Sequence, residues 1–388
     1  MNWVFVLVMY GLLIFGVFMI ESAARHVSVT RENLATFGSA GAYFAAKQKT
    51  FIVIGSIAYF VAAFVDYRWI RWLGIPFYVV SMGLMIVAMQ QDDSVHQLRL
   101  GGLSFQPAQL GITSGILLIA WLVQDLPKLH RWFGAPFIRI GIIGVVAAVP
   151  FLMVMKMGDM GSALVWIPVA IVALLIGGIP FRYLTCMAFI GAGIIPLLYF
   201  VALPLVSKRG PERIDVWLRM MEGREVDISG DAYAPHNVSM AVGKAGWKGI
   251  GWNSASKESL HEKGFIPRET AHNDYIFAVI AEELGFRGSL LLLTAFALLM
   301  IQGLFIAFYS RDVSGRLLVC LVVALFFAHV FESIGMCVLI MPITGIPLPL
   351  VSYSGTFVVI CMFLLGLVQS VWVHRNWKPE IAVKQAEA

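Results

Sequence analysis

The chain has 388 residues, of which 59% are hydrophobic and only 13% are charged, with a formal net charge of +5. Soluble globular proteins average about 25% charged residues, so this composition excludes a water-exposed surface over most of the chain. The modest positive charge fits basic loops beside anionic lipid headgroups and argues against a nucleic-acid-binding surface. The sequence therefore predicts an integral membrane protein with no nucleic-acid partner.

Ten apolar segments are long enough to cross a bilayer, whose core of about 30 Å requires roughly 20 helical residues. The N-terminal segment has neither a cationic region nor a small-residue cleavage site, so it is predicted to be a retained span rather than a signal peptide. We expect an all-α, single membrane domain over 1–388, with a large structured loop at about 206–285 between helices 7 and 8. The expected spans are 2–20, 50–65, 70–90, 107–124, 137–155, 162–179, 182–205, 286–309, 317–341 and 350–373.

Lysine and arginine in the short loops predict the orientation, because cytoplasmic loops carry an excess of these residues. An inside N-terminus places more of them inside than outside, and an even number of spans then puts both termini in the cytoplasm and the long loop outside. The inner loops would hold Arg68, Arg71, Lys128, Arg131, Arg139, Arg182, Arg311, Arg316, Arg375 and Lys378, and the short outer loops Arg25, Arg31, Lys47, Lys49, Arg99 and Lys156.

The long loop begins with a basic and amphipathic stretch. Apolar and basic residues recur at helical spacing over 213–223, which predicts a helix lying at the level of the lipid headgroups. A basic cluster at its start can bind a diphosphate, or it can be snorkelling side chains at the membrane surface. The cluster comprises Lys208, Arg209, Arg213 and Arg219.

The end of the long loop, 264–286, is the most informative segment. Polar residues including Asp274 stand directly before an apolar helical run that holds Glu282, and their spacing predicts one shared helix face. A carboxylate at the mouth of a membrane cavity can act as a general base. The alternative is that Asp274 merely caps a helix.

A glycine-rich stretch, 239–252, lies earlier in the loop and contains Lys244. Such a segment can approach a phosphate closely, with lysine as the counter-charge. It lacks the ending of a P-loop and no strand precedes it, so an ordinary turn-rich loop is the alternative.

Polar residues elsewhere in the apolar chain are further candidates. Asp159 lies between spans five and six, and Gln106 precedes Pro107 at the start of span four. His329 and Glu332 sit in span nine as either a weak metal pair or a structural hydrogen bond. Three prolines interrupt 341–356, which predicts a re-entrant loop with Ser352 and Tyr353 facing a cavity, or a plain tight loop.

Several of these segments together resemble one known family. GIPLPLVSYSGT (345–356) resembles the GIPLP…SYGG signature, and HNDYIFAVIAEELGFRG (272–288) is similar to HTDFIFAVIAEELGFIG, of the shape, elongation, division and sporulation (SEDS) family. GDMGSALV (158–165) and SFQPAQL (104–110) resemble two further motifs in the same order. The resemblance covers nearly the whole chain and is to RodA/FtsW-like proteins, with RodA favoured.

The resemblance implies a peptidoglycan glycosyltransferase that polymerises lipid II into β-1,4-linked strands during elongation, with inversion and release of undecaprenyl diphosphate. It assigns the essential carboxylate to Asp274 and implies substrate-binding roles for residues of the matched segments and their surroundings. It also implies a bacterial inner-membrane location and a class B penicillin-binding protein as partner. The substrate-binding candidates are Arg213, Lys244, Lys208, Asp159, Gln106, Ser352, Tyr353 and Glu282.

The chain also departs from the family pattern. A Glu and a Lys of the QPSE-x-x-K motif are replaced by Gln109 and Ile112, and an Asn is replaced by Ser333 beside Glu332. These losses leave a non-catalytic scaffold open as one alternative function. A lipid II flippase is the other, because binding of a lipid-linked substrate in a side-open groove suits transport as well as polymerisation. No cofactor is evident and no metal-ligand spacing is present, although a divalent cation at the diphosphate is compatible with the chemistry.

Overall fold

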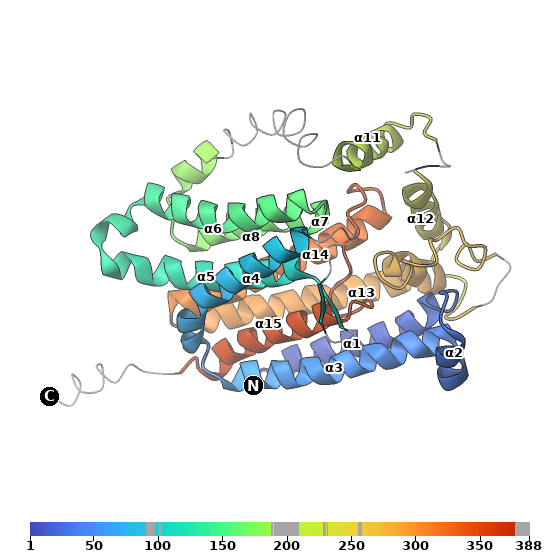
Figure 1. Cartoon of the computed structure of the whole chain (residues 1–388), viewed down its shortest axis with the longest axis horizontal. Helices are drawn as coiled ribbons and strands as arrows, with labels where there is room; N and C mark the ends of the chain where they lie inside the picture. The colour runs from blue at the N-terminus through green and yellow to red at the C-terminus, as the bar shows by residue number, and fades with distance from the viewer. Residues whose placement is uncertain are drawn as a thin grey trace.

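Long apolar helices make up most of the computed structural model (Figure 1), which describes residues 1–90, 98–100, 103–187, 189, 209–227, 230, 232–254 and 258–376. Within these residues, seven helices are long and apolar enough to cross a membrane. The expectation of an all-α, multi-pass membrane protein is thereby confirmed. The seven are α1 (Trp3–Ala23), α4 (Ile70–Met89), α5 (Pro107–Leu129), α6 (Pro136–Lys156), α13 (Ile276–Tyr309), α14 (Val313–Cys337) and α15 (Thr356–Val373).

Two further predicted spans coincide with helices. The 25-residue α3 (Ala40–Phe64) covers all but the last residue of the span expected at 50–65 and begins ten residues earlier. Helices α7 (Met160–Leu164) and α8 (Trp166–Ile176) cover most of the span expected at 162–179. The span expected at 182–205 lies mostly outside the described residues. Short 3-10 turns, η1 (Tyr67–Trp69) and η2 (Arg131–Gly134), join α3 to α4 and α5 to α6.

One small sheet was not expected in an all-α chain. Strands β1 (Leu98–Leu100) and β2 (Leu103–Phe105) pair antiparallel, with Leu98 opposite Phe105. The hairpin leads directly into α5, which begins at Pro107 as the sequence predicted.

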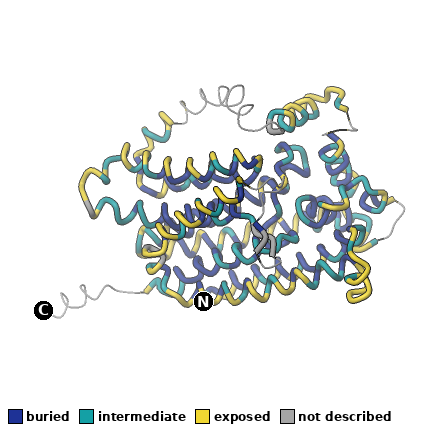
Figure 2. The backbone as a smooth tube through the Cα atoms, viewed as in Figure 1, coloured by how far each residue is buried: buried dark blue, intermediate teal, exposed yellow. Residues whose placement is uncertain are grey.

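The core of the bundle is built around α14, which contacts α5, α8, α13 and α15. In the most apolar 18-residue stretch of α14, 78% of the residues are buried. In the corresponding stretches of α4 and α6 only 28% are buried. Figure 2 shows the same gradient, with buried backbone inside and exposed backbone on the outer helices. Since the exposed side chains of those outer helices are largely apolar, their outward faces suit lipid rather than water.

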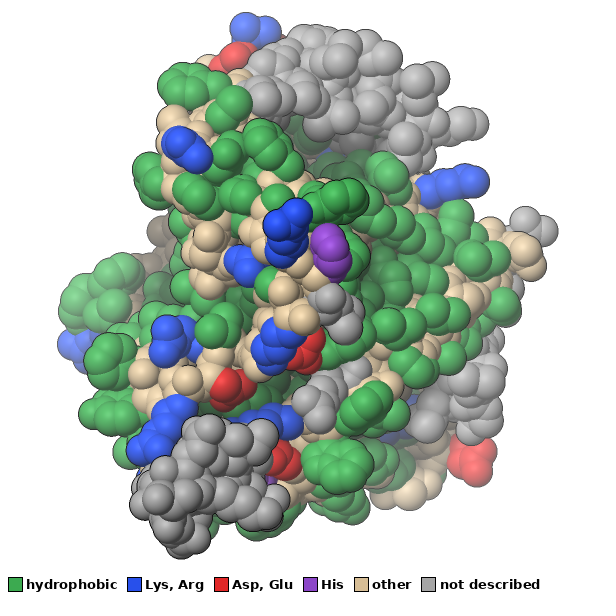
Figure 3. Space-filling model, turned by 90° about the vertical axis from the view of Figure 1, so that its left-hand side faces the viewer, with side chains coloured by type: hydrophobic (Ala, Val, Ile, Leu, Met, Phe, Trp, Pro, Cys, Tyr) green, Lys and Arg blue, Asp and Glu red, His purple; other side chains and the backbone are tan. Residues whose placement is uncertain are grey.

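The two ends of the bundle differ in character. Helices α2 (Arg31–Phe37), α11 (Arg209–Met221) and α12 (Tyr233–Lys244) lie at one end, whereas α1 begins and α15 ends at the other (Figure 1). Figure 3 views this second end and shows many basic and few acidic side chains. The connections and adjoining helix ends contribute Arg68, Lys128, Arg131, Arg139, Arg182, Arg311, Arg316 and Arg375.

Helix α13 is kinked at Gly285, where φ is 67° and ψ is −164°. The glycine-rich segment 246–251 lies along this kink and exchanges backbone hydrogen bonds with it, including Ile250 N to Glu282 O (3.0 Å) and Phe286 N to Gly246 O (2.9 Å). Only glycine adopts such backbone angles without strain, and a Cβ at Gly285 would lie 2.3 Å from the nitrogen of Gly249. The kink therefore separates a short N-terminal part of α13 from residues 286–309, which would span about 36 Å.

Candidate active site

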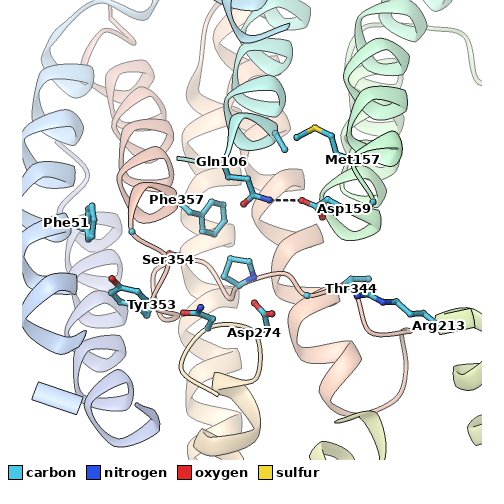
Figure 4. Close-up of a pocket in the computed structure, with 16 residues that line it drawn as sticks. Phe51, Gln106, Met157, Asp159, Arg213, Asp274, Thr344, Tyr353, Ser354 and Phe357 are labelled. Carbon is cyan, nitrogen blue, oxygen red and sulfur yellow. Dashed lines mark hydrogen bonds between the residues drawn. The ribbon is translucent and has the colours of Figure 1, made fainter. Parts of the chain in front are cut away.

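A cavity of about 540 Å³ opens between the helices, and polar side chains from distant parts of the sequence line it (Figure 4). Helix α3, the start of α5, the turn before α7, helix α11 and the loop before α15 each contribute. The lining residues are Phe51, Gln106, Ala108, Met157, Gly158, Asp159, Arg213, Asn273, Asp274, Thr344, Gly345, Pro347, Tyr353, Ser354, Gly355 and Phe357.

Asp274 projects into this cavity from the turns that precede α13. Its backbone amide donates to the carbonyl oxygen of Thr270 (3.0 Å), and α13 begins two residues later with Tyr275 at the N-cap position. The side chain of Asp274 therefore does not cap the helix, and it does not share a face of α13 with Glu282. Both of those sequence interpretations are wrong, because the chain turns at 267–275 before it becomes helical.

The electrostatic environment of Asp274 favours its protonated form. Burial, followed by the negative charge of Asp159, raises the pKa of this carboxyl to about 7, while the positive charge of Arg213 acts in the opposite direction. Among the described residues, no donor hydrogen-bonds to the carboxylate, so nothing fixes its charge by direct contact. A carboxylate with a pKa near neutrality and free oxygens can accept a proton from a ligand.

The loop before α15 lies against Asp274, and of the two side chains predicted to face a cavity, Tyr353 does so and Ser352 does not. Gly345 has a φ of 74°, and a Cβ on it would lie 3.6 Å from Oδ2 of Asp274. Ser352 is fully buried, and its hydroxyl accepts from the amide of Leu348 (2.9 Å) and donates to the carbonyl of Asn273 (2.6 Å). The amide of Tyr353 donates to the carbonyl of His272 (3.0 Å). Ser352 thus supports the cavity wall from behind, while Tyr353 lines the cavity itself.

Asp159 stands on another side of the same cavity and is held firmly. Its Oδ1 accepts from the amide of Ser162 (3.0 Å) as the N-cap of α7, and its Oδ2 accepts from Nε2 of Gln106 (2.7 Å). Burial raises the pKa of Asp159, while the donors from Ser162, the charge of Arg213 and the donor from Gln106 oppose that rise.

Arg213 reaches the cavity from α11, the amphipathic helix that the sequence predicted. Trp217 Nε1 donates to the carbonyl of Leu339 (2.8 Å), and a guanidinium nitrogen of Arg213 donates to the carbonyl of Ile343 (3.4 Å). These contacts hold α11 against the loop before α15. Among the described residues that line the cavity, Arg213 is the one cation beside two carboxylates.

Two candidates predicted from the sequence lie elsewhere. Lys244 and Glu282 line a separate pocket of about 410 Å³. The carboxylate of Glu282 accepts hydrogen bonds from the amides of Leu260 and His261, the latter at 3.2 Å, so it anchors the polypeptide of the long loop. Lys208 lies outside the described residues.

The glycine-rich segment has a structural partner rather than a place in the cavity. Its backbone pairs with the kink of α13, which agrees with the alternative of a turn-rich loop. His329 contacts the carbonyl of Leu325 through Nδ1 (3.0 Å) and not Glu332. No group of three or more His, Cys, Asp or Glu side chains suited to a metal ion occurs in the described part of the chain.

Aromatic side chains complete one wall of the cavity and were not predicted. Phe51 from α3 and Phe357 from α15 line it beside Tyr353 (Figure 4). The rings of Phe44 and His272 pack 4.5 Å apart behind Tyr353. Burial lowers the pKa of His272 to about 4, so this ring, two residues before Asp274 in the chain, is neutral near pH 7.

The comparisons with known proteins agree on one family. Residues 2–377 match the model of the FtsW, RodA and SpoVE family, described as cell cycle proteins. The chain is 30% identical over 307 residues to the peptidoglycan glycosyltransferase MrdB of Escherichia coli K12, covering 78% of each chain.

Two solved structures share the fold. One, from a study of the structural coordination of polymerization and crosslinking by a peptidoglycan synthase complex, has a TM-score of 0.76 at 22% identity and covers 97% of this chain and 99% of its own. The rod shape determining protein RodA of Thermus thermophilus has a TM-score of 0.64 at 21% identity and covers 97% and 98%.

Proposed function

The chain belongs to the FtsW, RodA and SpoVE family of cell cycle proteins, and on this premise we propose that it is a peptidoglycan glycosyltransferase that polymerises lipid II. MrdB, to which the chain is 30% identical, is named a peptidoglycan glycosyltransferase. The observation that supports the proposal most directly is Asp274, a half-buried carboxylate with a pKa near 7 in a polar cavity of about 540 Å³.

Asp274 is the general base of the proposed reaction. It takes the proton from the 4-hydroxyl of the acceptor GlcNAc, and that oxygen attacks the anomeric carbon of the donor MurNAc. The bond from this carbon to undecaprenyl diphosphate breaks, and the α-linked donor becomes a β-1,4 linkage. Only one base is required because diphosphate is a good leaving group, and the base supplies roughly 10²–10⁴ in rate.

Arg213 stabilises the negative charge that develops on the departing diphosphate. Its guanidinium is the cation of the described cavity wall, and charge-assisted hydrogen bonds from arginine to phosphate suit this task. Gln106, Asp159 and Tyr353 line the same cavity and contact the substrate, with Ser352 holding the wall behind them.

Lys208, Lys244 and Glu282 are the remaining candidates for substrate binding. Lys208 precedes α11 in the sequence, where it supplies positive charge for the lipid diphosphate. Lys244 and Glu282 line the second pocket and contact parts of the substrate that lie further from the reacting atoms.

The proposed setting is the bacterial inner membrane, with both termini in the cytoplasm and the active site outside. The basic end of the bundle, seen in Figure 3, contains the loops on the same side as the termini, as the positive-inside rule expects. The proposed partner is a class B penicillin-binding protein, and the role is cell elongation, in line with the likeness to MrdB and to RodA.

A lipid II flippase is the second candidate function, because a lipid-linked substrate in a polar intramembrane cavity suits transport as well. The enzyme forms glycan product in detergent without any gradient. The flippase moves lipid II across sealed liposomes, and this movement need not depend on Asp274.

The deciding experiment incubates the purified protein with lipid II in detergent, with and without its partner, and resolves the glycan strands on a gel. We expect Asp274→Ala and Asp274→Asn to abolish polymer formation. Asp215→Asn is the matched control, since Asp215 lies on α11 with its side chain 53% exposed and paired to Arg219. Normal polymerisation by the Asp274 variants would overturn the proposal.

A further inference from the structure

Asp159 and Asp274 line one cavity together with a single described cation, and they differ in their hydrogen bonds. Both line the cavity with Arg213 (Figure 4). Asp159 accepts hydrogen bonds from Gln106 and from the amide of Ser162, whereas Asp274 accepts none from the described residues. Hydrogen bonds to a carboxylate favour its charged form, so the charge of Asp159 has a direct stabilisation that the charge of Asp274 lacks.

One short segment of the loop before α15 holds the two carboxylates in fixed relation. Gly345 lies against Oδ2 of Asp274. The neighbouring Thr344 and Ile346 pack on Gly161 in the first turn of α7, where a Cβ would approach within 2.9 Å and 2.4 Å of their side chains. Asp159 caps α7, and residues 344–346 pack tightly between α7 and Asp274. A shift of the Asp159 carboxylate relative to Asp274 would therefore require residues 344–346 to move.

From this geometry we infer that Asp159 is a positioning residue that makes Asp274 a stronger base, by presenting a fixed negative charge across the cavity. The inference rests on the proposed function. It gives Asp159 an electrostatic role that is separate from any contact of its own with the substrate. An ionised Asp159 repels the ionised form of Asp274, and a base whose pKa lies near the working pH transfers protons most effectively.

The other charged and titratable groups around Asp274 are few in the described residues. Arg213 faces it from α11, Cys337 from the end of α14, and Tyr275 follows it in the chain. Glu332 on α14 interacts electrostatically with Asp159. Asp159 and Arg213 are the two that act on the charge of Asp274, and they act in opposite directions.

The test is the pH dependence of kcat/KM for polymerisation of purified lipid II in detergent, between about pH 5 and 9. The wild-type rate rises with pH as Asp274 ionises. We expect Asp159→Asn to move the midpoint of this rise to lower pH by roughly half to one unit, and the plateau rate to fall several-fold because the base is weaker. Arg213→Gln should move the midpoint to higher pH, and Asp215→Asn on α11 should leave it unchanged.

Asparagine keeps an N-cap acceptor for α7, and Asp159→Ser is a second uncharged variant with a capping side chain. Thermal unfolding provides a measurement that needs no turnover. The difference in Tm between the wild-type protein and Asp274→Asn, followed against pH, has a midpoint that reports the ionisation of Asp274. When both proteins also carry Asp159→Asn, this midpoint should move to lower pH. If Asp159→Asn raises KM but leaves both midpoints unchanged, the inference is overturned, and Asp159 acts only by contacting the substrate. If the wild-type protein makes no polymer, the proposed function fails instead.

Discussion

The hydroxyl of Ser352 donates a 2.6 Å hydrogen bond to the carbonyl oxygen of Asn273, the residue immediately before Asp274. The same hydroxyl accepts from the amide of Leu348 at 2.9 Å. One buried side chain therefore ties the loop before α15 to the turn that carries the proposed base.

Ser352→Ala should lower activity mainly through kcat. The substitution leaves the amide of Leu348 and the carbonyl of Asn273 buried without this partner, at a cost of about 1–3 kcal/mol in the free energy of unfolding. Asp274 then loses its fixed position, and small misplacements of a catalytic group are expensive in rate. Steady-state kinetics with lipid II and thermal unfolding in detergent measure the two effects. Thr50→Ala is the control, because Thr50 is exposed and bonds only to its own helix; equal effects of the two variants would contradict the assignment.

Gly285→Ala should destabilise the protein severely. Alanine disfavours a φ of 67° and a ψ of −164°, and its Cβ would collide with the backbone of Gly249. The paired segment 246–251 would separate from α13, so loss of the folded protein in size-exclusion chromatography is the expected result. Gly141→Ala on α6 provides the matched control, since open space surrounds Gly141. It should be neutral or stabilising by up to about 1 kcal/mol.

The sequence predicted the parts of the site whose residue types stand out against an apolar background. Asp274 and Asp159 are charges beside membrane spans, and Arg213 belongs to an amphipathic repeat, so each could be identified without coordinates. Phe51 could not, because a phenylalanine that faces lipid, core or cavity looks the same in an apolar segment. The separation of Glu282 from Asp274 was also hidden, since it depends on α13 beginning only at Ile276.

Arg25→Ala should cost far more stability than the loss of an exposed arginine. Arg25 bridges Glu283 at 2.8 Å and Glu262 at 3.0 Å, and the Glu283 side chain is only 1% exposed. Removing the cation leaves a buried carboxylate without its counter-charge, which costs roughly 3–5 kcal/mol. Arg224→Ala is the comparison, because its ion pair with Glu222 is 70% and 50% exposed and contributes about 1 kcal/mol or less. Similar Tm values for the two variants would contradict the buried network.

Asp274→Asn should make the protein more stable above neutral pH while it abolishes catalysis. The pKa of Asp274 is raised from 3.8 to about 7 by burial, so its protonated form is favoured in the folded protein. A group with a raised folded-state pKa contributes stability that is present below pH 3.8 and is lost as pH rises through about 7. The shift corresponds to at most about 4 kcal/mol. Thermal unfolding of both proteins at pH 6 and pH 8 measures the difference. The Tm advantage of Asp274→Asn should grow between these values. A constant advantage would show that the carboxylate is already ionised at pH 6, and a shrinking one would contradict the raised pKa.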